Sequence, residues 1–254
     1  MLPPAVNVMV NAARLGGNVL LRHINRLDAL NGVQKQRMDY ASEVDEQAEK
    51  AVIKELRKAY PDAAFLGEEG GAQGKGNAVF VIDPLDGTTN YLHGHPQYAI
   101  SMALLHKGKL QEALVYAPER NDCYMASRGQ GALRNDRRIR VSNRIELNRC
   151  LIGTGFPVVD QSMMDTYLAI LKDFLAKTAG GRREGAGCSA SWVLGRKGPC
   201  LSPCLQCRSF RQGPVCGRRR GEEAHAARGR GACRHDQSEV REYGRRGALF
   251  GREA

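Results

Sequence analysis

The chain has 254 residues, a formal net charge of +11, 42% hydrophobic residues and 26% charged residues. These values are typical of a globular protein with a buried core, so they exclude a wholly disordered or fibrous protein. Near the N-terminus, Asn7, Asn11 and Arg14 interrupt the apolar residues. We therefore expect no signal peptide and no membrane span, and we expect a cytoplasmic protein.

The composition of the chain changes near residue 187. Residues 1–187 carry 24 Lys and Arg against 21 Asp and Glu, whereas residues 188–254 carry 14 against 6. The second segment holds six of the eight cysteines but only 9 residues of Ile, Leu, Val, Phe or Met. A charged segment with so few large apolar residues rarely builds a core. We expect a folded domain over residues 1–187, with Cys123 and Cys150 as reduced buried thiols, followed by a disordered Arg/Gly/Cys-rich tail.

Apolar residues at three-to-four spacing predict two amphipathic helices, over residues 3–26 and 43–59. Gly16 and Gly17 weaken the middle of the first helix and suggest a bend there. Pro61 ends the second helix. Short apolar runs then predict strands, and a third amphipathic helix is expected over residues 163–179. The expected strands are 63–67, 78–82, 98–106, 111–117, 123–126, 139–141 and 151–155. This order predicts a layered α/β (α+β) architecture.

The segment Val79–Asn90, VFVIDPLDGTTN, carries the chemistry. We expect a buried strand that ends at Asp83, a turn enforced by Pro84, and Asp86 three positions after the first carboxylate. The two carboxylates and the Leu85 carbonyl can then face one point. Hard divalent cations such as Mg²⁺ require oxygen ligands clustered in this way.

Gly87, Thr88 and Thr89 follow as the start of a helix, where free backbone N–H groups and the helix dipole favour a phosphate. The alternative is a polar turn with a helix cap and no ligand. The buried strand before the motif and the Thr-Thr-Asn sequence after it favour the metal and phosphate interpretation.

Glu68 and Glu69 follow the expected strand over residues 63–67. Alone, such a pair is more often a solvated acidic turn, but the Asp83 loop makes Glu68 a candidate metal ligand and water-orienting group. Asp39 and Asp45 occupy positions where surface charges are usual. Asp45 also lies near the start of the expected second helix, where the helix dipole favours a carboxylate.

Four sequence elements carry a resemblance to a known family: GEE at 67–69, DPLDGTTN at 83–90, the strand at 98–105 and TGFP at 154–157. On these elements, residues 5–187 resemble the inositol monophosphatase family. The resemblance implies an αβαβα sandwich, usually a homodimer, with Li⁺-sensitive, Mg²⁺-dependent hydrolysis of a phosphate monoester. Inositol 1-phosphate is the first expected substrate.

The resemblance also implies roles for individual residues. The implied metal ligands are Glu68, Asp83, the Leu85 carbonyl and Asp86. The implied phosphate and substrate contacts are Asp86, Gly87, Thr88 and Thr89. Thr88 with Glu68 would orient the attacking water, while Lys35 and Asp45 match the family's lysine and acidic position near the metals. Two metals about 3.5–4 Å apart neutralise charge on the attacking and leaving oxygens.

The resemblance ends after Gly187. The family's second half supplies a Trp-Asp pair whose Asp completes the second metal site, but here Trp192 precedes Val193. We favour an out-of-frame tail, because the composition changes abruptly. One alternative is a zinc module, and the other is a basic RNA-binding tail. The residues concerned are Cys200, Cys204, Cys207 and Cys216 for zinc, and Arg218–Arg220 with Arg228 and Arg230 for RNA.

Two classes of function follow. The first is Mg²⁺-dependent hydrolysis of a phosphate monoester, with the second metal site weakened and part of the sheet uncovered. The second is a catalytically impaired homologue that binds RNA or the transcription machinery, including RNA polymerase. Asp83→Asn separates them, because it should abolish catalysis and leave binding of RNA or a protein intact.

Overall fold

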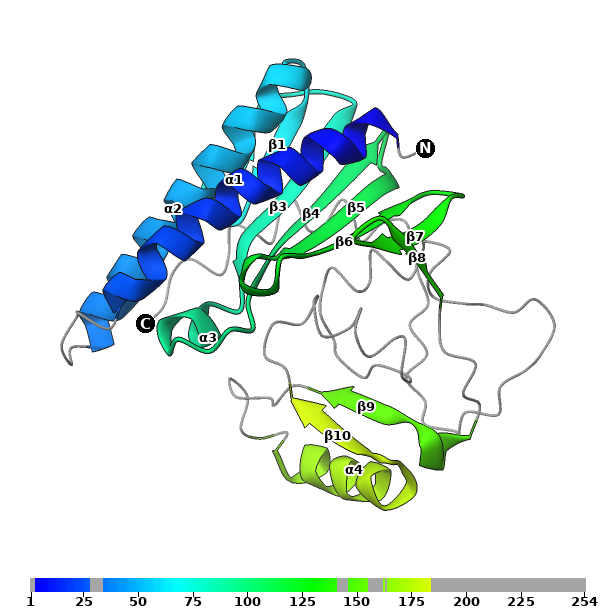
Figure 1. Cartoon of the computed structure of the whole chain (residues 1–254). Helices are drawn as coiled ribbons and strands as arrows, with labels where there is room; N and C mark the ends of the chain where they lie inside the picture. The colour runs from blue at the N-terminus through cyan, green and yellow to red at the C-terminus, as the bar shows by residue number, and fades with distance from the viewer. Residues whose placement is uncertain (1–2, 28–33, 141–145, 155–161, 163, 184–254) are drawn as a thin grey trace. The chain divides into compact units, whose positions relative to one another are not determined.

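A computed structural model describes residues 3–27, 34–140, 146–154, 162 and 164–183 (Figure 1). All of these belong to the first of two compact units of the chain, residues 1–217. The expected tail, its cysteines and Trp192 lie outside the described residues, and so do residues 155–157 of the TGFP element.

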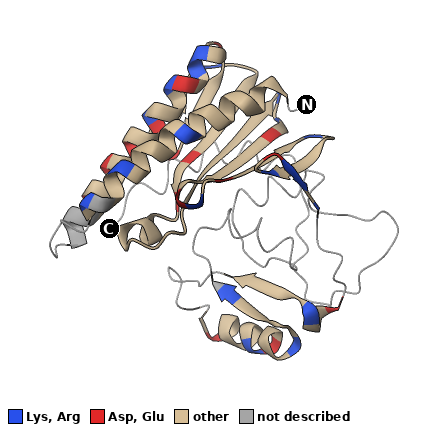
Figure 2. Cartoon of the chain, in the orientation of Figure 1, with Lys and Arg blue, Asp and Glu red and all other residues tan. Residues whose placement is uncertain are grey.

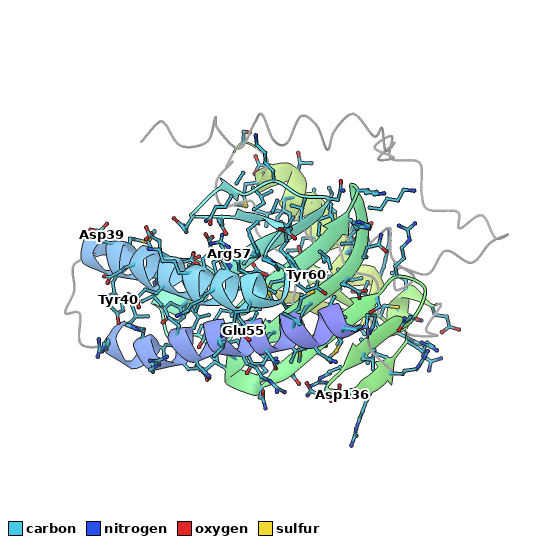
Figure 3. The ribbon with its side chains drawn as sticks, turned by 90° about the horizontal axis from the view of Figure 1, so that it is seen from above. Asp39, Tyr40, Glu55, Arg57, Tyr60 and Asp136 are labelled. Atoms are coloured by element: carbon cyan, nitrogen blue, oxygen red, sulfur yellow. The ribbon has the colours of Figure 1, made fainter. Side chains whose placement is uncertain are left out.

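Two long helices, α1 (Pro4–Leu27) and α2 (Gln34–Ala59), pack against each other and lie along one face of a sheet (Figures 1 and 3). The first helix was predicted correctly. The second begins nine residues before the predicted start, since its first turns are mostly polar and show no apolar period. Tyr40 in this missed part packs against the core, and its hydroxyl lies 2.7 Å from Nδ1 of His23.

Gly16 and Gly17 do not break α1, which is a single helix through both residues, so the expected bend is wrong. Their role is close packing. A Cβ on Gly16 would lie 2.7 Å from Val52 and 2.9 Å from Ile100, and a Cβ on Gly17 would lie 2.7 Å from Tyr116. The two glycines therefore let α1 approach both α2 and the sheet.

Gly16→Val should lower the free energy of unfolding by about 2–3 kcal/mol, because the added methyl groups have no space between α1, α2 and the sheet. Urea unfolding followed by circular dichroism measures this. Asn18→Val, which puts the same side chain at an exposed position of α1, is the matched control. Equal stability of the two variants would show that the helix contact does not require glycine.

The sheet has eight strands in the order β2-β1-β3-β4-β5-β6-β7-β8. β1 and β3 are parallel, and all other neighbours are antiparallel. The strands span β1 Ala64–Gly67, β2 Ala72–Gln73, β3 Ala78–Asp86, β4 Ala99–His106, β5 Lys109–Ala117, β6 Asp122–Ser127, β7 Gly131–Arg134 and β8 Arg137–Ile139. The sequence missed β2 and β7, which are short and have few apolar residues.

The main core lies between the two helices and the sheet. Leu20 of α1 and Leu56 of α2 are fully buried there, as are Phe65, Phe80 and Ile100 of the strands. The rings of Phe65 and Phe80 stack across the parallel pair β1 and β3, with centroids 5.8 Å apart. The parallel pair that positions the candidate site is therefore supported directly by the core.

A second, two-stranded parallel sheet joins β9 (Leu151–Thr154) to β10 (Gly180–Arg183). The helix between them, α4 (Met164–Lys177), confirms the amphipathic helix expected there. The hydroxyl groups of Thr154 and Tyr167 lie 2.8 Å apart and link β9 to α4. Cys123 and Cys150 are buried free thiols, as predicted. Among the described helices, none combines the length and apolar character required to cross a bilayer.

Candidate metal site

The parallel pairing of β1 and β3 brings Glu68 beside Asp83. Gly67 pairs with Ile82, so the next residue of each chain segment is Glu68 on one side and Asp83 on the other. The carboxyl ends of parallel strands meet at the same edge of a sheet, which explains why these two chain positions, fifteen residues apart in sequence, become neighbours.

β3 does not end at Asp83 as predicted. It continues through Pro84 to Asp86, and the pairing with β4 shifts between the two carboxylates. Asp83 pairs with Ser101 and Asp86 with Ala99, so two residues of β3, Pro84 and Leu85, lie opposite one residue of β4, which defines a β-bulge. A bulge tolerates Pro84, because the ring nitrogen there need not donate to the ladder. The expected turn at Pro84 is therefore wrong.

The bulge decides where the two carboxylates point. Residues three apart in a regular strand lie on opposite faces of the sheet. Ser101 and Ala99 are two apart on β4 and share a face, so their partners Asp83 and Asp86 share that face as well. The inserted residue thus turns Asp86 to the same side as Asp83.

The chain then turns into the short helix α3 (Thr88–Leu92). Gly87 precedes it with φ of 103°, in the left-handed region that favours glycine. The Thr88 hydroxyl donates a hydrogen bond of 3.2 Å to the Leu85 carbonyl. This bond links the start of α3 to the bulge that separates Asp83 from Asp86.

Two side chains of α3 itself hold this helix in place. Asn90 donates from Nδ2 to the Gln97 carbonyl at 2.6 Å, and the buried Tyr91 hydroxyl donates to the Leu20 carbonyl at 2.8 Å. The ring of Tyr91 also packs edge-on against Tyr98. The final Asn of the DPLDGTTN motif therefore closes the loop that follows it.

Asp45 is neither at the start of a helix nor on the surface, so both expectations for it are wrong. It lies in the interior of α2, with 4% of its surface exposed, because α2 begins earlier than its sequence period suggests. Burial, and then the charges of Glu68, Glu69 and Glu49, raise the pKa of Asp45 to about 8. Its Oδ1 is buried and accepts no hydrogen bond within the described residues.

Glu49 was missed by the sequence reasoning. It lies one helical turn after Asp45, is 3% exposed, and accepts hydrogen bonds from the backbone N–H groups of Glu69 and Gly70 at 3.1 and 3.0 Å. The sequence signal was the i, i+4 spacing of Asp45 and Glu49 on one helix face. Burial, and then the charges of Glu68, Glu49 and Glu46, raise the pKa of Glu69.

The donors fit a hard cation by their chemistry. They are carboxylate and carbonyl oxygens, which suit Mg²⁺ and related ions, and the unpaired Oδ1 of Asp45 lies among like charges that a cation would relieve. In the described ranges, however, no three Asp, Glu, His or Cys side chains converge closely enough to ligate one ion. Glu68 itself is exposed, so its side chain would turn inward to bind.

The remaining predicted positions lie along α2. Asp39 is exposed near the start of the helix, as expected for a surface charge (Figure 3). Lys35 belongs to the first turn of α2, and its side chain is outside the described residues.

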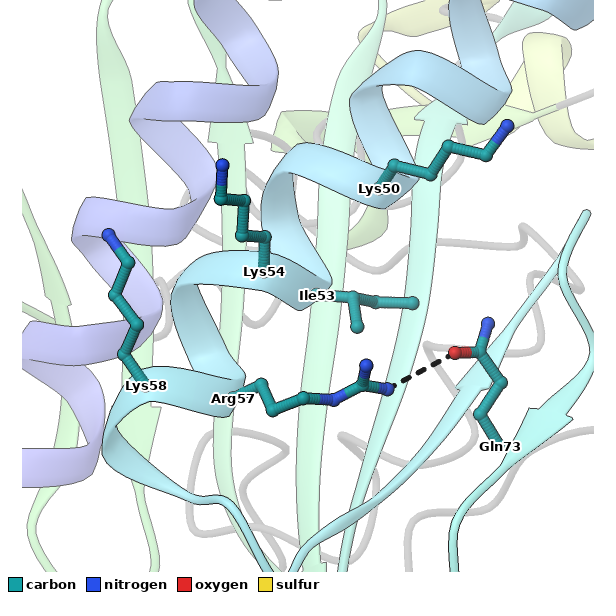
Figure 4. Close-up of a pocket in the computed structure, with 6 residues that line it drawn as sticks. All are labelled: Lys50, Ile53, Lys54, Arg57, Lys58 and Gln73. Atoms are coloured by element: carbon teal, nitrogen blue, oxygen red, sulfur yellow. Dashed lines mark hydrogen bonds between the residues drawn. The ribbon is translucent and has the colours of Figure 1, made fainter.

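A basic groove lies between α2 and β2, away from the predicted site residues, none of which lines it (Figure 4). It has a volume of about 420 Å³. Arg57 donates to Gln73 at 3.2 Å and lies over the ring of Phe65. The lining residues are Lys50, Ile53, Lys54, Arg57, Lys58 and Gln73. Acidic and basic residues alternate along α2 (Figure 2), and Lys50 and Lys58 of the groove pair with Glu46 and Glu55, so the groove is part of a mixed surface.

A family model described as the inositol monophosphatase family matches residues 2–194 of the chain. The chain belongs to the inositol monophosphatase family. A putative Nus factor SuhB of Neisseria meningitidis serogroup B is 68% identical over 185 residues, which cover 72% of this chain and 71% of the relative. An inositol-1-monophosphatase of Rhizobium meliloti is 42% identical over 185 residues, covering 71% and 69%.

Solved structures of the inositol monophosphatase family share the fold. The extragenic suppressor protein suhB of Bartonella henselae superposes with a TM-score of 0.70 at 37% identity, over 84% of this chain and 83% of the other. An inositol monophosphatase from Anabaena gives a TM-score of 0.65 at 30% identity, over 77% and 73%. The expected inositol monophosphatase-like α/β architecture is therefore confirmed.

Proposed function

We propose that this chain carries the metal-binding half of a Mg²⁺-dependent phosphate monoester hydrolase, with inositol 1-phosphate as substrate. The supporting observation is the strand geometry: the β1–β3 register brings Glu68 to Asp83, and the bulge puts Asp86 on the same face as Asp83. Glu68, Asp83 and the Leu85 carbonyl would hold the first Mg²⁺. Asp83 and Asp86 would share the second.

Each residue has a role that its position allows. When bound, Mg²⁺ supplies positive charge at the phosphoryl oxygens and makes water more acidic. Glu68 then accepts a proton from the attacking water. The Thr88 hydroxyl donates a hydrogen bond to the Leu85 carbonyl, which leaves the lone pairs of the hydroxyl oxygen to accept one from that water and orient it. Backbone N–H groups of Gly87, Thr88 and Thr89, with Asp86, would contact the phosphate and substrate.

The test is release of inorganic phosphate from inositol 1-phosphate by the full chain across a Mg²⁺ titration. We expect release that requires Mg²⁺ and is inhibited by Li⁺, with a Mg²⁺ requirement above the millimolar range because the Trp-Asp carboxylate of the second site is missing from the sequence. Saturation at low Mg²⁺ would contradict the weakened second site. Release that persists in EDTA would contradict metal dependence.

The domain boundary and the assembly are part of the same proposal. We place the phosphatase domain at residues 1–187, the non-family tail at 188–254, and the active form as a homodimer. Resequencing codons 180–195 tests the tail, since recovery of a Trp-Asp pair in another frame would show a coding shift. Sedimentation velocity tests the dimer, and a monomer at every concentration would contradict it.

A second function is favoured by the names of relatives. Proteins of Neisseria meningitidis, Xylella fastidiosa and Pseudomonas aeruginosa that match this chain are named Nus factor SuhB or putative Nus factor SuhB. We propose that this chain also contacts RNA or RNA polymerase, independently of catalysis. Pull-down of RNA polymerase and fluorescence anisotropy with RNA should then give the same result for wild type and Asp83→Asn. Loss of both interactions in the variant would contradict independence.

A further inference from the structure

We propose that Glu49 is a positioning residue for the metal loop: its buried carboxylate fixes the Gly67–Gly71 turn so that Glu68 meets Asp83. This extends the proposed function, on which it rests, to a residue that touches neither ion nor substrate. The structure places one carboxylate of α2 against two consecutive backbone N–H groups that directly follow Glu68.

Both carboxylate oxygens of Glu49 are used by the loop. Oε2 accepts from the N–H of Glu69 at 3.1 Å, and Oε1 accepts from the N–H of Gly70 at 3.0 Å. Hydrogen bonds to an ionised acceptor are stronger than neutral ones, and the pair fixes orientation as well as distance. Because both oxygens already face N–H donors, Glu49 acts on the loop rather than as a ligand itself.

Two glycines of the loop, Gly67 and Gly70, lie so close to this carboxylate that a side chain would not fit. A Cβ on Gly67 would meet Oε2 of Glu49, and a Cβ on Gly70 would meet Oε1, both closer than the 3.0 Å that real Cβ atoms respect. The Gly67 N–H also donates to the Gly71 carbonyl at 3.1 Å, which closes the turn. The absence of side chains at both positions therefore lets the backbone reach the buried carboxylate.

This contact restricts the direction of Glu68, which the strand before it does not. Glu68 follows a four-residue strand and is exposed, so the strand alone leaves its direction free. Asp83 and Asp86, by contrast, are held within β3 and its bulge. An anchor from the core helix α2 fixes the one predicted ligand that the sheet does not hold.

The test compares Glu49→Gln with Glu46→Gln. Gln keeps the size of Glu49 but offers one acceptor oxygen and turns an NH₂ group toward a backbone N–H. Glu46 lies on the same helix, is exposed and pairs with Lys50 rather than with the loop backbone, so its replacement makes the same charge change without removing the two hydrogen bonds to the loop. Calorimetric titration of the full chain should show Mg²⁺ affinity lowered at least about 10-fold in Glu49→Gln and little changed in Glu46→Gln.

Hydrogen exchange gives a readout that does not need the metal. The amides of Glu69 and Gly70 should exchange at least about 10-fold faster in Glu49→Gln than in wild type, while amides of β3 stay protected. Unchanged exchange overturns the proposal, and so does unchanged Mg²⁺ affinity where wild type binds Mg²⁺. If wild type binds no Mg²⁺, the proposed function fails, and the exchange result alone decides the positioning of the loop.

A second variant disturbs the same contact from the loop side and replaces Glu49→Gln in the test if that protein does not fold. Gly70→Ala adds one methyl group against Oε1 and leaves the carboxylate in place. It should also accelerate exchange at Glu69 and weaken Mg²⁺ binding. Wild-type behaviour of Gly70→Ala in both measurements would overturn the proposed contact.

Discussion

Asp83→Asn should lower Mg²⁺-dependent phosphate release from inositol 1-phosphate by at least about 100-fold, which corresponds to about 2.7 kcal/mol of transition-state stabilisation. Asp83 is the residue that would contact both ions, and the β1–β3 register, in which Gly67 pairs with Ile82, places it next to Glu68 along the two strands. Asn keeps the shape of the side chain but loses the charge and one acceptor. Initial rates of phosphate release at saturating substrate, across a Mg²⁺ titration, measure the effect.

Asp39→Asn is the matched control, because it removes the same charge from an exposed position of α2. We expect it to retain the wild-type rate. A rate in Asp83→Asn within a few fold of that in Asp39→Asn would mean that the hydrolytic centre lies elsewhere in the chain.

Asp45→Asn should make the metal-free protein more stable at pH 8, by about 2–3 kcal/mol. Burial and then the neighbouring glutamates raise the pKa of Asp45 from 3.8 to about 8 in the folded protein. Between those pH values the unfolded chain has released this proton and the folded chain has retained it. The free energy of unfolding contributed by this group therefore falls as the pH rises from 3.8 to about 8, and Asn removes that loss.

The same substitution should reduce the stabilisation that Mg²⁺ provides, since the carboxylate that benefits from the cation is gone. Thermal unfolding in EDTA and in Mg²⁺, at pH 5 and pH 8, measures both effects. Asp62→Asn, at an exposed site after α2, is the control and should change neither. If Asp45→Asn is less stable than wild type at pH 8 in EDTA, Asp45 is not the strained carboxylate that its surroundings imply.

The sequence predicted most of the secondary structure where the period is strong. The positions of α1 and α4 followed from their apolar spacing, and those of β4 and β5 from their apolar runs. Polar segments gave no such signal, so the start of α2 was missed. The position of Asp45 was mispredicted for the same reason: it was expected near the start of the helix, but it is buried in the helix interior.

The candidate site divides in the same way. Glu68, Asp83 and Asp86 were named as candidate ligands from residue type and motif, and their role as ligands stays a prediction. The bulge at Pro84 could not be predicted from the sequence, because it depends on how β3 pairs with β4, a separate segment of the chain. Glu49 was missed for the same reason: its partners are backbone N–H groups twenty and twenty-one residues away, which carry no side-chain signature.

The most direct test of the metal site uses Mn²⁺, which prefers the same oxygen ligands as Mg²⁺ and broadens nearby amide signals in an NMR spectrum of the full chain. We expect selective broadening at the ends of β1 and β3, centred on Glu68 and on Asp83 to Thr88, and recovery of those signals when excess Mg²⁺ is added. Broadening centred elsewhere, or none at these residues, would contradict a metal site formed by Glu68, Asp83 and Asp86.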